Sequence, residues 1–178
     1  LINAFGTEAD HAIVSGDPAR RAAAAGLAKG VRVSWPKYPS LKGKPWLGRL
    51  KRLAAAMAGY DLICTYNWGA MDAVMAHTLF AHSHGLPPLV HHEDGFDHDE
   101  IRRLKLSRNL YRRIALGRAS ALIVPSERLE AIARDAWQQP AWRIRRSDAG
   151  PGNGAAASEG KSVQRKGRKD LAKDAKDS

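Results

Sequence analysis

Short apolar runs alternate along the chain with longer segments in which apolar residues recur at helical spacing. The apolar runs predict strands, some with the turn that follows, at residues 11–17, 31–36, 60–66, 88–94 and 120–126. The longer segments predict helices at residues 18–30, 46–58, 68–85, 99–117 and 126–137. Short strands that alternate with longer helices are typical of βαβ units. The pattern therefore predicts an α/β fold with a Rossmann-like parallel sheet and helices on both faces.

Residues that commonly begin or end helices stand at several of these boundaries. Gly30 and Gly85 each follow a helical segment, and glycine closes helices because it adopts the left-handed backbone freely. Ser126 precedes another segment, and its hydroxyl can accept a hydrogen bond from a free N–H in the first turn. Residues 1–5 are interpreted as the end of a helix that starts earlier.

Residues 147–178 differ in composition from the rest of the chain. They contain almost no large apolar side chains, and they hold seven basic and five acidic residues among many Gly, Ala and Ser. Such a segment cannot bury a core. We therefore expect a domain of residues 1–146 and a disordered, charged tail of residues 147–178. The near balance of its charges favours a solvated tail over a nucleic-acid-binding arm.

Charge and cysteine content narrow the class of protein further. The formal net charge of +11 suits either a basic soluble surface or a polyanionic partner such as lipid, nucleic acid or a phosphorylated substrate. The single cysteine, Cys64, excludes an internal disulfide framework, and its apolar surroundings predict an inert buried thiol. No run reaches the ~18 to 20 apolar residues that span a bilayer, and no secretory signal is visible at the start.

A polar cluster follows the predicted strand at 88–94, in the sequence HHEDGFDHDE. A shared metal ion is disfavoured because adjacent residues on a strand, such as His91 and His92, point to opposite faces. Acid–base catalysis is possible in principle, since ligands of parallel sheets bind beyond the carboxyl ends of the strands. The alternative is a polar strand end whose carboxylates, Asp97 and Asp99, cap the next helix. Spacing alone slightly favours that alternative.

Common nucleotide and nucleophile motifs are missing. The sequence contains no G-x-x-x-x-G-K-[ST], no G-x-G-x-x-G and no G-x-S-x-G. The glycine-rich GPGNG lies in the predicted tail with no strand before it. The chain therefore carries no sequence signature of a phosphate loop or a serine nucleophile.

The helix predicted from about residue 101 to residue 116 combines an apolar and a basic face. By 100° steps the apolar face comprises Leu104, Ser107, Leu110, Tyr111 and Ile114. The basic face comprises Arg102, Lys105, Arg108, Arg112 and Arg113. We expect either a solvated basic face above a sheet or, as a sharper hypothesis, docking to anionic lipid head groups. Nucleic acid is less favoured because no recognition helix or stacking-aromatic motif accompanies the charge.

Three stretches together suggest a family. In chain order they are YDLICTYNWGAMDA, GLPPLVHHEDGFDHDE and LYRRIALGRASALIVPSERLEAI. Together they resemble the amino-terminal domain of GT-B glycosyltransferases of family 4. The resemblance covers roughly residues 1–146. It implies one half of a GT-B fold, in which this domain binds the acceptor and a second domain binds the nucleotide-sugar donor. It also implies transfer of a sugar to an acceptor hydroxyl, usually without a bound metal or other cofactor, and often to a lipid-linked acceptor at the inner face of the membrane.

The resemblance also implies site residues. The family's strand usually ends in a histidine near the acceptor, and that position is Asp94 here, so Asp94 is expected to act as base or orienting group. The acceptor side is expected to comprise His91, His92, Glu93, Gly95, Thr65, Asn67 and Trp68. A cytoplasmic protein is expected, with peripheral attachment at the inner membrane face left open.

The chain departs from the family pattern at both ends. The family's first strand with its Gly-rich turn and the donor domain are not recognised in this sequence. This favours either a shifted reading frame or a truncated gene, and a fragment that is expected to be inactive by itself. A basic α/β module that binds anionic lipid or nucleic acid without chemistry stays open as the second hypothesis. A hydrolase that uses the His/Asp cluster is a third.

Overall fold

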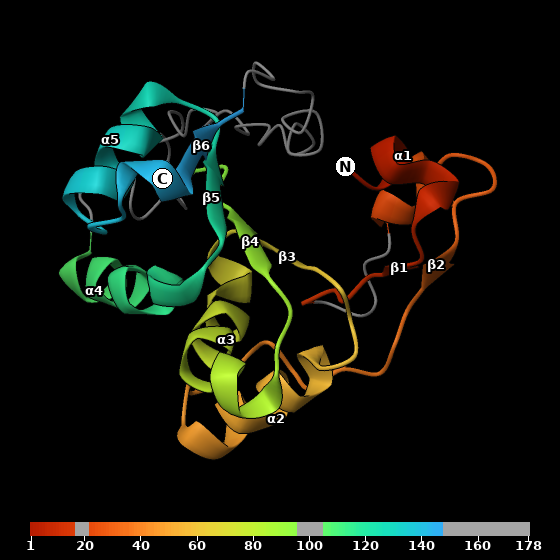
Figure 1. The fold of residues 1–178 in the computed structure, drawn as a ribbon, viewed down its shortest axis with the longest axis horizontal. Coiled ribbons are helices and arrows are strands. Elements are labelled where there is room, and N and C mark those ends of the chain that lie inside the picture. Colours follow the sequence, from red (N-terminus) through yellow and green to blue (C-terminus); the bar gives the residue numbers. More distant parts are fainter. Residues whose placement is uncertain (17–21, 96–104, 148–178) are drawn as a thin grey trace, which may run out of the picture. The chain divides into compact units, whose positions relative to one another are not determined.

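A four-stranded parallel sheet forms the centre of the described structure. The computed structural model describes residues 1–16, 22–95 and 105–147 (Figure 1). The sheet follows chain order through β3 (Ile63–Tyr66), β4 (Leu89–His92), β5 (Ala121–Val124) and β6 (Ile144–Arg146). All three pairings are parallel, and helices flank the strands. The predicted α/β, Rossmann-like fold is thus confirmed.

Four α-helices lie in the same part of the chain as this sheet. They are α2 (Leu47–Met57), α3 (Met71–His84), α4 (Leu106–Ala115) and α5 (Glu127–Asp135). Helix α3 packs against both α2 and α4, and short 3₁₀ turns occur at η3 (Trp68–Ala70), η4 (Leu116–Arg118) and η5 (Ala141–Arg143). The strands and helices predicted for residues 46–94 and 120–137 are all present, with ends shifted by a few residues.

Two predicted helix caps are confirmed. Gly85 closes α3 in the left-handed conformation at φ 55°, with its N–H donating to carbonyls of the last turn. Ser126 begins α5, and its Oγ accepts a hydrogen bond of 3.3 Å from the N–H of Leu129. These two residues fix where each helix stops or starts, and therefore how the chain enters β4 and leaves β5.

The first third of the chain forms a smaller, separate parallel pair. Strand β1 (His11–Ala12) pairs with β2 (Val33–Ser34), next to α1 (Ile2–Phe5) and η1 (Gly6–Glu8). The predicted helix at 18–30 is described only from residue 22, and there it is the 3₁₀ segment η2 (Ala22–Gly26), which ends before the predicted cap at Gly30. An alanine-rich segment has little large apolar surface with which tertiary packing could stabilise an α-helix.

Strand β6 was not expected from the sequence. It contributes only Ile144 to the buried side, while Arg145 and Arg146 are exposed on the sheet edge. Charged side chains on a short edge strand protect it from pairing with other chains. Because two of its three residues are arginines, the segment has no run of apolar residues that would predict a strand from the sequence.

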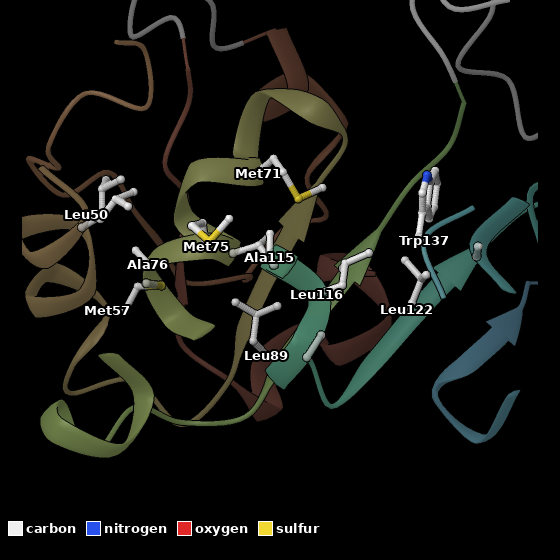
Figure 2. Close-up of a cluster of buried hydrophobic side chains, with 14 of the residues drawn as sticks. Leu50, Met57, Met71, Met75, Ala76, Leu89, Ala115, Leu116, Leu122 and Trp137 are labelled. Carbon is white, nitrogen blue, oxygen red and sulfur yellow. The ribbon is translucent and has the colours of Figure 1, made fainter. Parts of the chain in front are cut away.

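A continuous apolar core lies between the sheet and the helices. Its centre is formed by large, fully buried side chains that include Met57, Met71, Leu89, Leu122 and Trp137 (Figure 2). Cys64 is only half-buried and is a free thiol. Burial raises the pKa of this thiol, so it stays protonated at neutral pH.

Within the described residues, no helix is both long and apolar enough to cross a bilayer.

The core predicts a contrast between two leucine substitutions. Leu122 is fully buried in β5, so Leu122→Ala should lower the free energy of unfolding by about 2 to 5 kcal/mol, from lost burial plus the cavity left behind. Leu47 is exposed at the start of α2, so Leu47→Ala should change it by less than about 0.5 kcal/mol. Urea unfolding of both variants measures the difference, and equal effects would show that the core is placed wrongly.

Candidate rim and hollow at the carboxyl ends of the strands

Two turns meet at the carboxyl ends of β3 and β4. The N–H of Asn67 donates to the carbonyl of His92 at 2.8 Å, which continues the strand pairing by one step. The N–H of Asp94 donates to Asn67 Oδ1 at 2.7 Å, and Asn67 Nδ2 donates to Asp94 Oδ2 at 3.4 Å. The parallel pairing of β3 with β4 brings these two turns to the same edge of the sheet. We call Asn67, Asp94 and their neighbours His92 and Tyr66 the rim.

The backbone at Asn67 has a conformation that non-glycine residues seldom adopt. Its φ is 56° and its ψ is −178°, and such outliers cost of order 1–3 kcal/mol and gather at functional sites. The side-chain amide compensates by making both bonds to Asp94. Asn67 and Asp94 are exposed to solvent, so the carboxylate is accessible to a ligand.

The side chains beneath the rim are buried. Alternation along β4 sends His91 and Glu93 to the interior, where each is 0 % exposed, while Asp94 is exposed and His92 half-buried. Thr65 in the adjacent strand is also buried, and its Oγ1 lies 2.8 Å from His91 Nδ1. Three of the expected acceptor-side residues are thus closed to solvent, and they can act on a ligand only by positioning the residues above them.

Glu93 forms a buried ion pair with helix α4. Arg112 Nε donates to Glu93 Oε2 at 3.2 Å, and His91 Nε2 lies 3.7 Å from the same oxygen. The Arg112 guanidinium also lies against two indole rings, 4.8 Å from the centroid of Trp68 and 5.1 Å from that of Trp137. Such cation–π contacts and the long aliphatic stem make a buried arginine tolerable. The pair ties α4 to the end of β4.

The predicted orientation of α4 is wrong in one important respect. Arg112 was expected on an outward basic face, but it is only 1 % exposed, and the adjacent Asn109 is buried with its Oδ1 accepting from Trp137 Nε1 at 3.0 Å. Because these polar contacts hold one face inward, the apolar side chains turn outward. Leu106 is 83 %, Leu110 56 % and Ile114 49 % exposed.

The other members of the expected basic face have different environments. Lys105 and Arg113 are exposed. Arg108 is half-buried with its guanidinium 5.0 Å from the centroid of the Trp68 ring. Arg102 lies outside the described residues, as does Leu104 of the expected apolar face.

His92 and Tyr66 form the second half of the rim. Their rings are stacked, with centroids 4.6 Å apart and planes 21° apart. Burial lowers the pKa of His92, although the nearby Asp94 opposes the shift, so the imidazole is neutral at pH 7. Burial, together with the Cys64 and Asp94 charges, raises the pKa of the Tyr66 phenol. Both rings are therefore uncharged next to the Asp94 carboxylate.

A hollow of about 530 Å³ adjoins the rim through Trp68. It lies between the loop before α2, the turn after β3 and the first part of α4. The lining residues are Leu41, Lys42, Gly43, Pro45, Trp68, Gly69, Asp72, Ser107, Arg108 and Tyr111. Sequence reasoning missed this hollow, because no local spacing connects three segments that only the fold brings together.

Asp72 is the carboxylate of this hollow, and it is held by two donors. Arg49 Nη1 donates to its Oδ2 at 2.5 Å, and the Tyr111 hydroxyl donates to its Oδ1 at 2.7 Å. Burial and this bond to Asp72 raise the pKa of Tyr111 above its usual value. The hydroxyl thus stays a donor to Asp72 over the physiological pH range.

In the part of the chain that the structure describes, no three His, Cys, Asp or Glu side chains are grouped so as to hold an ion. Asp97, His98 and Asp99 of the polar cluster lie outside it.

A family model described as a glycosyl transferase 4-like domain matches residues 2–147. The chain belongs to this family. The resemblance inferred from the three sequence stretches is therefore confirmed, and with it a role in the glycosyltransferase family, whose reactions in general transfer a sugar from a nucleotide-sugar donor to an acceptor. No curated protein and no solved structure gives a significant match. Gly95 and Trp68, the remaining expected acceptor-side residues, are half-buried directly beside the rim.

The buried ion pair predicts a non-additive response to substitution. Glu93→Gln removes the carboxylate that accepts from Arg112 Nε, and Arg112→Met removes that buried donor to Glu93, so each should lower the free energy of unfolding by about 3 to 5 kcal/mol. The double variant should lose clearly less than the sum of both, because both members of the pair are then removed together. Urea unfolding of the single and double variants measures the coupling.

The control for this cycle is the exposed pair of Arg146 and Glu127, 3.1 Å apart. Glu127→Gln should cost less than about 1 kcal/mol. Additive effects of the Glu93 and Arg112 substitutions would show that the two side chains do not interact in solution.

Proposed function

We propose that this chain is the acceptor-binding half of a sugar transferase, with Asp94 at the reacting hydroxyl. The observation that carries the proposal is the pairing of Asn67 with Asp94 at the carboxyl ends of adjacent parallel strands. In open α/β sheets, ligands bind in the crevice outside those strand ends. A nucleotide-sugar donor would be held by a second domain, and the proposal assigns neither a metal nor a cofactor to this half.

Asp94 is suited to orient an acceptor hydroxyl and to take its proton. Its carboxylate is exposed and anchored through both its backbone N–H and one oxygen by Asn67. A carboxylate has about four acceptor positions, so the bond from Asn67 leaves room for a ligand hydroxyl. During transfer the sugar–phosphate bond of the donor breaks, the acceptor oxygen bonds to the anomeric carbon, and the hydroxyl proton passes to Asp94.

The neighbouring residues fit supporting roles. Neutral His92 and Tyr66 provide polar rings beside the carboxylate without adding charge, and Trp68 offers an aromatic surface next to Asn67. His91, Glu93 and Thr65 are assigned a positioning role, since they are buried below the rim and hold β3, β4 and α4 together.

Attachment to an anionic membrane is the second part of the proposal. The apolar side chains of Leu106, Leu110 and Ile114 form an outward stripe along α4, where all three are exposed to solvent. Lys105 and Arg113 are exposed on the same helix. A helix with an apolar stripe and basic neighbours lies well in a lipid interface. A domain attached in this way to the cytoplasmic membrane face would meet a lipid-linked acceptor presented there. It also describes the non-catalytic alternative, a basic module that binds lipid and no sugar.

The rim predicts that sugar binding depends on Asp94. The chain is titrated with neutral and phosphorylated hexosides, and binding is measured by saturation-transfer NMR. Asp94→Asn removes a charged acceptor, which is worth ~1.5 to 3 kcal/mol, so the Kd should rise about tenfold or more. Asp135→Asn, an exposed carboxylate on α5, is the matched control and should leave Kd unchanged. No binding of any hexoside, or an equal response of both variants, would contradict the proposed site.

The outward stripe predicts lipid binding that depends on apolar side chains. Replacing Leu106, Leu110 and Ile114 together by Gln should weaken binding to vesicles of phosphatidylcholine and phosphatidylglycerol about tenfold or more, because most of the inserted apolar surface is lost. Leu62→Gln, another exposed leucine, serves as control. Vesicle co-sedimentation across salt concentrations is the measurement. If binding stayed tight in the triple variant, the contact would depend on charge alone, and insertion of the apolar stripe would be contradicted.

A further inference from the structure

Trp46, at the start of α2, is a large aromatic side chain on the protein surface. It is 58 % exposed, and the Arg52 guanidinium lies over its ring, 5.5 Å from the centroid. Tryptophan carries a large apolar surface and is highly buried on average. An exposed tryptophan whose ring is held in one place is therefore a candidate contact for a ligand.

The place of this ring depends on a glycine. A Cβ added at Gly48 would overlap ring carbons of Trp46, so the ring occupies the space that a side chain at residue 48 would take. Gly48 and Arg52 are four residues apart in α2, and residues at this spacing are neighbours on one face of a helix. The ring therefore lies along the surface of α2, and the rest of it is open to solvent.

The way in which the ring lies distinguishes between two classes of ligand. A lipid anchor inserts apolar side chains into the membrane interface, whereas the Trp46 ring lies back against α2 with a charged guanidinium over it. The C–H groups of a pyranose, in contrast, pack well on an aromatic ring. Its hydroxyls can accept from the guanidinium of Arg52, which has five N–H donors. Trp46 and Arg52 together suit one neutral sugar ring.

Trp46 and the rim are connected to the hollow from two sides. Pro45, the residue before Trp46, lines the hollow, and so does Trp68, the residue after Asn67 of the rim. The hollow therefore lies between the segments that carry Trp46 and Asn67. A ligand bound at both segments has to extend along the hollow, which favours an acceptor of more than one sugar.

We propose that Trp46 is a stacking platform for an outer sugar of the acceptor, while the hydroxyl that receives the new sugar lies at Asp94. The proposal rests on the proposed function, and it narrows the acceptor to an oligosaccharide chain. The sugar on Trp46 takes no part in the reaction. It adds affinity, and it fixes the direction in which the acceptor chain lies across the domain.

The test uses the whole chain, labelled with ¹⁵N so that the indole resonances of its five tryptophans are visible. The probes are linear trihexosides of glucose, mannose and galactose, each compared with the methyl hexoside of the same sugar. At least one trihexoside should bind about three- to tenfold more tightly than its methyl hexoside, since one aromatic stacking contact is worth about that factor. It should also shift the Trp46 resonance, which is assigned with Trp46→Phe.

Two substitutions locate the outer sugar. Trp46→Ala should remove the gain in affinity, so that the trihexoside binds as weakly as the methyl hexoside, whose own Kd should not change. Gly48→Ala keeps the indole but displaces it, so it should weaken the trihexoside as well. Alanine favours a helix more than glycine does, so α2 should be kept in this variant.

The matched control is a second exposed tryptophan with an arginine at its ring. Trp142 is 64 % exposed, and the Arg143 guanidinium lies 4.9 Å from its ring centroid. Trp142→Ala should leave the Kd of every probe unchanged. Thermal unfolding of each variant verifies that the fold is kept.

The possible outcomes separate this inference from the proposed function. If no trihexoside binds more tightly than its methyl hexoside, the platform is overturned. The platform alone is also overturned if Asp94→Asn weakens the trihexoside and Trp46→Ala does not. If Trp46→Ala weakens the trihexoside and Asp94→Asn has no effect, the platform is supported and the reacting site at Asp94 is contradicted.

A lipid surface is the alternative occupant, because Leu47 beside Trp46 is 67 % exposed. Co-sedimentation with vesicles of phosphatidylcholine and phosphatidylglycerol tests it. If Trp46→Ala weakens vesicle binding but leaves the Kd of the trihexoside unchanged, Trp46 is a lipid contact and the sugar platform is overturned. If it weakens the trihexoside and leaves vesicle binding unchanged, the platform is supported.

Discussion

The buried ion pair between Glu93 and Arg112 is the contact on which the arrangement of the rim depends. A charge without a partner would not be stable in this interior, so Glu93 at the end of β4 and Arg112 in the middle of α4 must remain together. The pair sets the distance and rotation of α4 against the sheet. It also places Arg112 under Trp68, and so supports the turn that begins at Asn67.

The rotation imposed on α4 explains the surface of this helix. With Arg112 and Asn109 facing inward, the set of Leu106, Leu110 and Ile114, spaced four residues apart, faces outward. Burying these residues instead would gain ~1.5 to 3 kcal/mol for each side chain, but it would separate Arg112 from Glu93 and Asn109 from Trp137. The polar face is buried because its partners are already fixed in the sheet and in the Trp137 side chain.

The features that could be predicted from the sequence are those set by local pattern and by parallel-strand geometry. The apolar runs at β3, β4 and β5, the caps at Gly85 and Ser126, and the meeting of Asn67 with Asp94 all follow from such rules. The orientation of α4 does not, because periodicity assumes that leucine is inside and arginine outside, and it has no information on Glu93 or Trp137. Strand β6 and the Arg49–Asp72–Tyr111 cluster also depend on contacts between segments far apart in the chain.

The rim and the hollow hold their carboxylates in different surroundings. Asp72 of the hollow is held by Arg49 and by the Tyr111 hydroxyl, whereas Asp94 of the rim is exposed and is bonded to Asn67. Trp68 connects the two, because its ring lines the hollow and its backbone continues the Asn67 turn. In the proposed function, contacts to the acceptor would depend on α4 and the loop before α2, and proton transfer on β3 and β4, with the Glu93–Arg112 pair holding these elements in register.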